Sequence, residues 1–179
     1  MILFITGGAR SGKSTAAVEA ARHCGRAVVF VATATAGDDE MVERIARHQN
    51  ERPDEWTTVE APCALAEAIT DADPGACVIV DCLSLWVANA LMTDETLSVE
   101  SLDQRLDAVV NAAGGRPGPT IVVSNEVGSG IVPDNLLGRT FRDLLGRANQ
   151  RFAAVADRAV LSVSGRLVDL GPASETLRV

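Results

Sequence analysis

The chain has 179 residues, of which 47% are apolar and 22% charged, a composition typical of a globular protein with one substantial core. No internal stretch is rich enough in Pro, Gly or Ser to form a linker, so we expect a single domain over residues 1–179. The formal net charge of −8 argues against binding to nucleic acid, because such binding relies on Lys and Arg, although a single nucleotide is not excluded. No apolar run approaches the roughly 18 residues that a membrane span needs, and the four cysteines lack disulfide or zinc spacing. We therefore expect a cytoplasmic protein with no membrane span and with its cysteines as small buried residues.

The first predicted element is a buried strand over residues 1–6, which leads directly into the octet GGARSGKS. This octet matches the phosphate-binding pattern G-x-x-x-x-G-K-[ST] at every fixed position. Gly7 and Gly12 allow the backbone to curl its N–H groups around an anion. Lys13 can reach the β- and γ-phosphates, and the Ser14 hydroxyl suits Mg²⁺. An Ala-rich helix follows with its positive N-terminal end at the same place, so we predict a nucleotide site and not merely a glycine-rich turn.

The rest of the chain alternates between apolar runs of strand length and periodic segments of helix length. In chain order, we expect a strand at 27–32, a helix at 38–52, a strand at 56–60, a helix from Pro62 to residue 73, a strand at 76–81, helices at 83–92 and 98–113, a strand at 120–124, a helix at 136–156 and a hairpin of strands at 159–163 and 167–170. This order predicts an α/β three-layer sandwich with a mostly parallel sheet and an antiparallel C-terminal edge hairpin. Ligands are expected at the carboxyl ends of the strands.

The helix at 136–156 is the longest that we predict. Its apolar residues recur at helical spacing, so one face should pack on the core. That face comprises Leu137, Phe141, Leu144, Leu145, Ala148, Phe152 and Val155.

Two further residues have side chains suited to phosphate chemistry. Asp81 closes a buried strand at the sheet edge where the phosphate loop lies, so its carboxylate can hold Mg²⁺, unless it merely caps the next helix. His48 lies on a helical stripe. Arg44, Arg47 and Arg52 lie near it as a cationic rim that could hold phosphates. Neighbouring positive charge favours the neutral imidazole, which is the nucleophilic form. A half-buried histidine without a chemical role is the alternative.

Several sequence blocks, taken in order, resemble one enzyme family. They are residues 7–14; Asp39-Glu40-Met41 with Arg44-Ile45 and His48; Glu51-Arg52-Pro53; Trp56, Thr58 and Glu60; Asn125-Glu126-Val127-Gly128 with Gly130-Ile131-Val132-Pro133; Phe141-Arg142-Asp143; Gly146-Arg147-Ala148-Asn149-Gln150; and Val163-Ser164-Gly165. With these blocks, nearly the whole chain is similar to the bifunctional adenosylcobinamide kinase / adenosylcobinamide-phosphate guanylyltransferase family of cobalamin biosynthesis.

This resemblance implies a RecA-like P-loop NTPase fold, a homotrimer and two reactions. The first phosphorylates adenosylcobinamide, and the second transfers GMP from GTP to adenosylcobinamide phosphate through a guanylylated histidine. The implied catalytic residues are His48 and Lys13, the implied cofactors are GTP, ATP and Mg²⁺, and the implied metal ligands are Ser14 and Asp81. The implied nucleotide contacts are Gly7, Gly8, Ala9, Arg10, Ser11, Gly12, Lys13, Ser14, Thr33, Ala34, Thr35, Gln49, Asn50, Glu51, Arg52, Glu60 and Asp81. Some members carry a second histidine where this chain has Arg47.

Other functions remain open at this stage. A P-loop kinase for another small metabolite would use Lys13, Ser14 and Asp81 but would give His48 no covalent role. A nucleotide-dependent switch lacks support because Ser124-Asn125-Glu126-Val127 does not supply the N-K-x-D guanine motif. A RecA-like binder of single strands is opposed by the negative charge and by the scarcity of aromatic residues. The sequence does not favour ATP over GTP as the phosphoryl donor.

Overall fold

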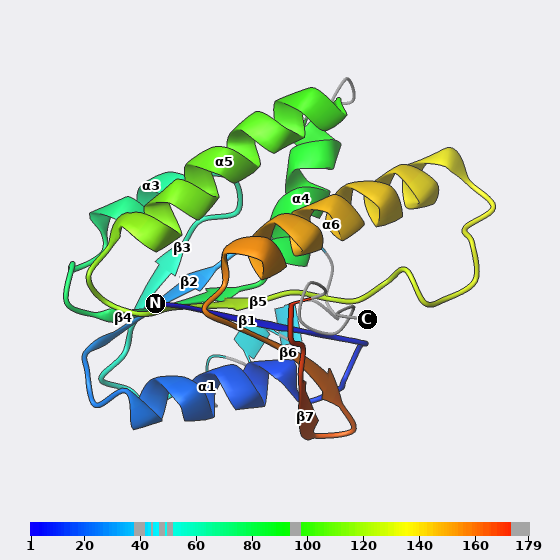
Figure 1. Ribbon diagram of the computed structural model, residues 1–179. Coiled ribbons are helices and arrows are strands. Elements are labelled where there is room, and N and C mark those ends of the chain that lie inside the picture. The colour runs from blue at the N-terminus through cyan, green and yellow to red at the C-terminus, as the bar shows by residue number, and fades with distance from the viewer. Residues whose placement is uncertain (38–41, 44, 47–48, 50–51, 94–97, 173–179) are drawn as a thin grey trace.

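A seven-stranded sheet forms the centre of the protein in the computed structural model, which describes residues 1–37, 42–43, 45–46, 49, 52–93 and 98–172. The strand order is β3-β2-β4-β5-β1-β6-β7 (Figure 1). The strands are β1 (Ile2–Gly7), β2 (Val28–Ala32), β3 (Thr57–Glu60), β4 (Cys77–Asp81), β5 (Thr120–Val123), β6 (Arg158–Val163) and β7 (Arg166–Asp169). Strands β1 to β6 run parallel, whereas β7 runs antiparallel to β6. The predicted mostly parallel sheet with an antiparallel C-terminal hairpin is confirmed.

Helices cover both faces of this sheet. Figure 1 shows α1 (Lys13–His23) on one face. The opposite face carries α3 (Leu65–Asp71), α4 (Leu83–Thr93), α5 (Val99–Gly115) and α6 (Leu136–Val155). The three-layer arrangement expected from the sequence is therefore confirmed.

The central strands are buried on both faces, which explains their nearly continuous apolar sequences. In β1, Phe4 belongs to the core under α3 to α6, while Ile5 belongs to the core under α1. Neighbouring residues of β4 divide in the same way, with Val80 on the first side and Ile79 on the second. The Phe4 ring stacks on Phe152 of α6 at a centroid distance of 6.1 Å, which connects the sheet to its longest helix.

The core face of α6 is shorter than the sequence predicts. Its middle residues Leu144, Leu145, Ala148 and Phe152 are buried, and Phe141 packs at their edge. Leu137 is 53% exposed and Val155 is 45% exposed, so their assignment to the core was wrong. Both lie in the end turns of the helix, where the apolar periodicity continues beyond the stretch that contacts other elements.

Most predicted boundaries agree with the structure to within a few residues. The helix expected to open at Pro62 begins at Leu65. The helix predicted at 38–52 lies partly outside the described residues, although residues 42–43, 45–46 and 49 are helical. Of the cysteines, Cys77 and Cys82 are buried as expected, but Cys24 is only half-buried and Cys63 is exposed. Within the described ranges, no helix is both long and apolar enough to cross a membrane.

Candidate functional site

The phosphate-binding motif forms a loop between β1 and the first turn of α1. Gly7 and Gly12 have φ angles of 153° and 98°, and Arg10 between them has a φ of 57°. Gly12 is the N-cap residue of α1, so the loop ends at the positive end of that helix. The Ser11 N–H donates to the Gly8 carbonyl oxygen at 3.3 Å, which closes the turn. The backbone therefore has the curled form that the motif predicts.

Lys13 points back into this loop. Its Nζ donates to the Gly8 carbonyl oxygen at 2.6 Å and lies 3.5 Å from the Ser11 hydroxyl, and the residue is only 8% exposed. Lys13 is also the only lysine in the sequence, whose other basic residues are arginines and two histidines. A compact ammonium group held by a backbone carbonyl oxygen and close to a hydroxyl can exchange these contacts for phosphate oxygens when a nucleotide binds.

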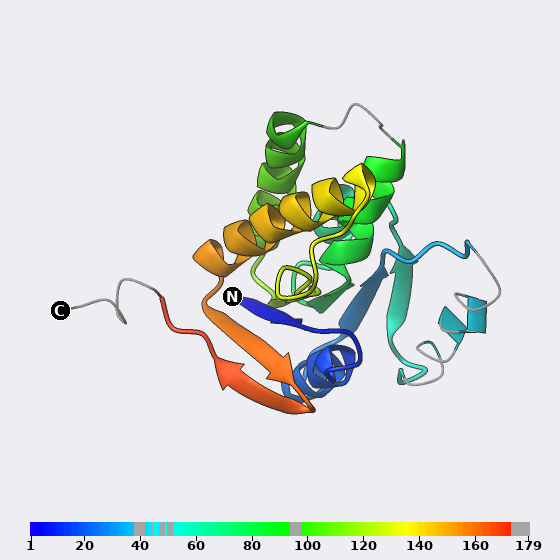
Figure 2. The same cartoon turned by 90° about the vertical axis from the view of Figure 1, so that its right-hand side faces the viewer.

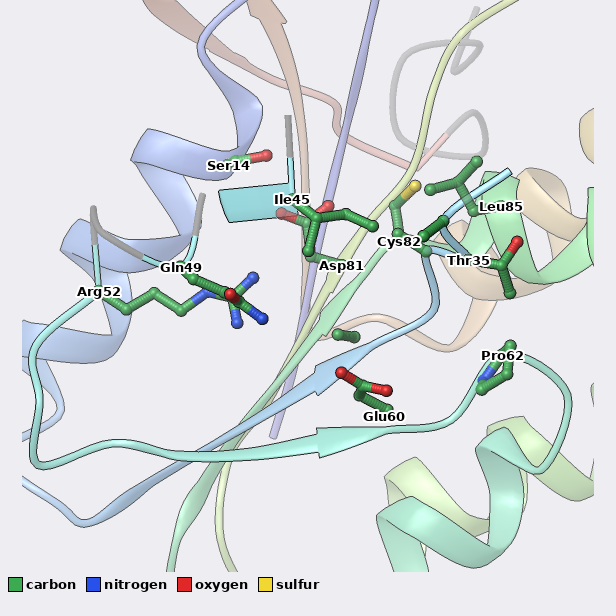
Figure 3. A pocket seen from close by; sticks show the side chains of 13 residues that line it. Ser14, Thr35, Ile45, Gln49, Arg52, Glu60, Pro62, Asp81, Cys82 and Leu85 are labelled. Carbon is green, nitrogen blue, oxygen red and sulfur yellow. The ribbon is translucent and has the colours of Figure 1, made fainter. Parts of the chain in front are cut away.

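A cavity of about 360 Å³ opens beside this loop at the carboxyl ends of the parallel strands (Figure 3). Such a volume lies within the usual range of small-molecule sites. The cavity is lined by Ser14, Ala32, Ala34, Thr35, Ala36, Ile45, Gln49, Arg52, Glu60, Pro62, Asp81, Cys82 and Leu85. The start of α1, the ends of β2, β3 and β4, and the chain between β2 and β3 thus meet at one place.

Many of the residues singled out from the sequence meet in this cavity. Those that line it are Ser14, Ala34, Thr35, Gln49, Arg52, Glu60 and Asp81. Gly7, Gly8, Ala9, Arg10, Ser11, Gly12 and Lys13 form the adjoining loop and are not lining residues. His48, Asn50 and Glu51 lie outside the described residues, and so do Arg44 and Arg47.

Two oxygen-bearing side chains in the cavity suit a divalent cation. The Ser14 hydroxyl comes from α1 and the Asp81 carboxylate from the end of β4, and both line the same space (Figure 3). Among the described residues there is no group of three or more His, Cys, Asp or Glu side chains that could hold a metal by itself. This donor set fits Mg²⁺, which usually binds through one or two protein oxygens together with phosphates and water.

Arg52 has a fixed position at the cavity wall. Its guanidinium carbon lies 3.5 Å from the centre of the Phe30 ring, and its Nη1 donates to the Thr58 hydroxyl at 3.3 Å. Figure 3 shows its side chain reaching into the space that Glu60 enters from β3. A cation and a carboxylate that enter the cavity from different segments of the chain can bind different parts of one polar ligand.

Thr33 is completely buried and fixes the end of β4. Its hydroxyl donates to the Cys82 carbonyl oxygen at 2.7 Å and accepts the Cys82 N–H at 2.8 Å. These bonds anchor the residue directly after Asp81. Thr33 therefore supports the wall from behind, whereas Thr35 lines the cavity itself.

The sequence analysis missed the apolar part of the cavity wall. Cys82, Leu85 and Pro62 line it, yet each has the sequence signature of an ordinary core or turn residue. Burial raises the pKa of the Cys82 thiol to about 11, so the thiol stays neutral, and its sulfur lies 2.9 Å from the Ser84 hydroxyl. The sequence did contain one signal. Cys82 and Leu85 are three residues apart, so in a helix that begins directly after Asp81 they would lie on the same face.

Comparisons with known proteins agree on a family. The family model described as cobinamide kinase / cobinamide phosphate guanyltransferase matches residues 3–170. The bifunctional adenosylcobalamin biosynthesis protein CobP of Pseudomonas aeruginosa is 44% identical over 162 residues, which cover 90% of this chain and 92% of that protein. The corresponding protein CobU of Salmonella typhimurium is 39% identical over 176 residues, covering 92% of this chain and 97% of its own length. CobU of Escherichia coli is 38% identical with the same coverage.

Solved structures with low sequence identity share the fold. An ATPase of the type III secretion system of pathogenic bacteria superposes with a TM-score of 0.59 at 14% identity, covering 89% of this chain and 51% of the ATPase. The RadB recombinase superposes with a TM-score of 0.50 at 15% identity, covering 89% of this chain and 73% of its own. These likenesses concern the fold alone, and they confirm the three-layer α/β fold predicted from the sequence.

Proposed function

Because the chain belongs to the cobinamide kinase / cobinamide phosphate guanyltransferase family, we propose that it phosphorylates adenosylcobinamide and then transfers GMP from GTP to the product. The observation that carries the proposal is the meeting of Ser14, Glu60 and Asp81 around one cavity beside the phosphate loop. A kinase for another metabolite and a nucleotide switch are not favoured, because the family match spans residues 3–170 and names both reactions. The family match thus supports a single chain that acts on the corrinoid twice.

In both reactions the loop would bind the nucleotide phosphates. The proposed phosphate contacts are the backbone of the loop residues Gly7 to Gly12 together with the side chain of Lys13, whose ammonium group already lies inside the loop. Ser14 and Asp81 would hold Mg²⁺, which when bound with a nucleotide neutralises charge on the phosphate oxygens. These phosphate and Mg²⁺ contacts would be the same for ATP and GTP, since the triphosphates of the two nucleotides are identical.

The part of the cavity wall at the ends of β2, β3 and β4, which consists of side chains, would bind the base and the sugar. The proposed contacts are Ala34, Thr35, Gln49, Asn50, Glu51, Arg52 and Glu60, whereas the predicted contact Thr33 is buried and supports the end of β4 from behind. Guanine presents an N–H and an amino group side by side, and a carboxylate can accept from both. We assign this role to Glu60, which makes the site more favourable for GTP than for ATP.

The transfer of GMP would proceed through His48. A neutral imidazole nitrogen attacks the α-phosphorus of GTP, a P–N bond forms, and pyrophosphate leaves with the electrons of the broken P–O bond. A phosphate oxygen of adenosylcobinamide phosphate then attacks the same phosphorus, the P–N bond breaks, and adenosylcobinamide-GDP and free imidazole result. Support comes from the next residue in the chain, Gln49, which lines the cavity.

Covalent labelling with α-³²P-GTP tests this assignment. The sequence contains two histidines and one lysine, so few nitrogen nucleophiles compete. Guanylyl-histidine and guanylyl-lysine are both acid-labile phosphoramidates, so the variants and not the acid lability identify the residue. We expect His48→Ala to lose the label completely and to keep the wild-type melting temperature.

His23→Ala is the matched control. His23 ends α1, and its Nδ1 lies 2.6 Å from the Glu19 carbonyl oxygen, outside the cavity lining. This variant should label as strongly as the wild type. Undiminished label on His48→Ala, or a labelled peptide that contains Lys13, would refute the histidine intermediate while leaving the kinase reaction untouched.

We further propose that the protein forms the homotrimer that its family resemblance implies. Support comes from exposed apolar side chains between β5 and α6 and at the start of α6, in the yellow segment of Figure 1. Ile131 is 97% exposed, and Val132, Leu136 and Leu137 are each more than half exposed. Burial of such side chains between subunits would stabilise an assembly.

A further inference from the structure

The C-terminal hairpin contacts the back of the phosphate loop. Figure 2 shows β6 and β7 extending to the start of α1, and β6 pairs with β1 in a register that places Ser162 beside Gly7. The Ser162 hydroxyl and the Gly165 N–H both donate to the Ser11 carbonyl oxygen, each at 2.8 Å. Ser162 is 1% exposed and Ser11 is 8% exposed, so these bonds are shielded from water.

The shape of the hairpin brings both donors to one oxygen. Strand β6 ends at Val163 and β7 begins at Arg166, so two residues form the turn. Ser164 and Gly165 have φ angles of 50° and 75°, the signs that a type I′ turn requires. The turn directs the Gly165 N–H toward the loop while the strand directs the Ser162 hydroxyl there.

The contact determines how one loop peptide is oriented. In a trans peptide the C=O and the following N–H point in opposite directions. Because the Ser11 carbonyl points to the hairpin, the Gly12 N–H points away from it. A peptide flip at this position would exchange the N–H for a carbonyl oxygen, which repels phosphate.

The hairpin also approaches two glycines of the loop closely, in addition to the positive φ angles that already favour glycine there. A Cβ atom at position 7 would overlap the Ser162 carbonyl oxygen, and one at position 12 would lie 3.2 Å from the Gly165 Cα atom. The sequence pattern attributes Gly7 and Gly12 to the loop alone. The structure shows that the hairpin also lies close to these positions, although Ser162 and Ser11 are 151 residues apart along the chain.

We propose that Ser162 and Gly165 are positioning residues for nucleotide phosphate, because they fix the Ser11–Gly12 peptide in the orientation that binds anions. The inference rests on nucleotide binding by the loop, as in the proposed function, but it does not depend on His48. It predicts that a defect at the hairpin lowers the affinity for every nucleoside triphosphate by the same factor. Binding of the corrinoid substrate should not change.

The test compares Ser162→Ala with the wild type by calorimetric titration of GTP and ATP and by the KM for adenosylcobinamide. Loss of one hydrogen bond to the buried carbonyl should weaken both nucleotides about three- to tenfold, with the corrinoid KM changed less than about twofold. Ser162→Cys keeps a side chain of similar size, but a thiol is a weak hydrogen-bond donor. Its affinities for GTP and ATP should therefore lie between those of the wild type and those of Ser162→Ala.

Thr120→Val is the matched control. Thr120 is a fully buried hydroxyl residue at the start of β5, at the amino ends of the strands and therefore away from the phosphate loop, and its hydroxyl lies 3.4 Å from the Ala113 carbonyl oxygen. This variant should bind nucleotides as the wild type does. Unchanged GTP and ATP affinities in Ser162→Ala, or a corrinoid KM that rises in parallel, would overturn the proposal. A wild type that binds GTP but is never guanylylated would instead contradict only the proposed histidine step.

Discussion

The two walls of the candidate site are built from different kinds of chemical group. The wall at β1 is a stretch of backbone, the phosphate loop, which Ser162 and Gly165 fix from behind. The wall at β2, β3 and β4 consists of side chains, among them Arg52, Glu60 and Asp81. Backbone N–H groups recognise phosphate, which all nucleoside triphosphates share, whereas side chains can distinguish one base from another. Strength of binding and choice of base should therefore be separable by mutation.

Replacement of Lys13 should have the largest effect, because Lys13 belongs to the wall that both reactions share. We expect Lys13→Met to lower the rates of phosphorylation and of guanylyl transfer by about 100-fold or more, as is typical when a charged group that stabilises developing phosphate charge is removed. Initial rates of both reactions, measured on one protein preparation, check this expectation.

Arg10→Met provides the control for Lys13, since Arg10 is a cation of the same loop but is exposed. Its replacement should lower the rates of phosphorylation and guanylyl transfer only a few-fold, because solvent screens its charge. If Lys13→Met abolished one reaction and spared the other, the two reactions would need separate phosphate sites, and the comparison of a shared wall with a selective wall would fail.

The elements of the fold were largely predictable because local patterns encode them. The apolar run that ends at Asp81 and the Ala-rich segment after Ser14 form β4 and α1 almost as predicted. Apolar periodicity does not report where a helix loses contact with the core, so Leu137 and Val155 were misplaced. Burial depends on what surrounds a residue, and for an end turn the sequence does not specify that.

The candidate site could be predicted only in part, again where a local pattern encodes it. The phosphate loop consists of eight consecutive residues with a recognisable pattern, whereas the opposite wall comes from separate segments and includes Cys82 and Leu85, which carry no distinctive signal. The contact between Ser162 and Ser11 depends on β6 lying next to β1. No local pattern specifies this pairing, so the support behind the loop could be found only in the structure.

Replacement of Glu60 should have an intermediate effect that is confined to one nucleotide. The amide of Glu60→Gln keeps the shape, but its NH₂ group opposes the donors of guanine, so we expect GTP affinity to fall about tenfold. ATP affinity should stay within about twofold of the wild type. Competition titrations with GTP, ATP and ITP measure the selectivity directly, since ITP lacks the amino group.

Glu67→Gln is the control for Glu60, because Glu67 is an exposed carboxylate on α3 and does not line the cavity. The Glu67→Gln substitution should leave the affinities for GTP, ATP and ITP unchanged. Equal losses of GTP and ATP in Glu60→Gln would mean that this wall, too, recognises a feature common to nucleotides. The division of tasks between the two walls would then be wrong.

The smallest effect is expected at the far end of the hairpin that supports the loop. Arg158 and Asp169 form an ion pair of 2.7 Å there, with side chains that are 65% and 57% exposed. Asp169→Asn should lower the free energy of unfolding by less than about 1 kcal/mol, as for other exposed pairs, and should leave GTP and ATP affinities unchanged. Denaturant unfolding and the same titrations measure both quantities. A loss of nucleotide affinity as large as that of Ser162→Ala would mean that the whole hairpin acts as a rigid support. Unchanged affinity would instead restrict the support to the turn that contacts Ser11.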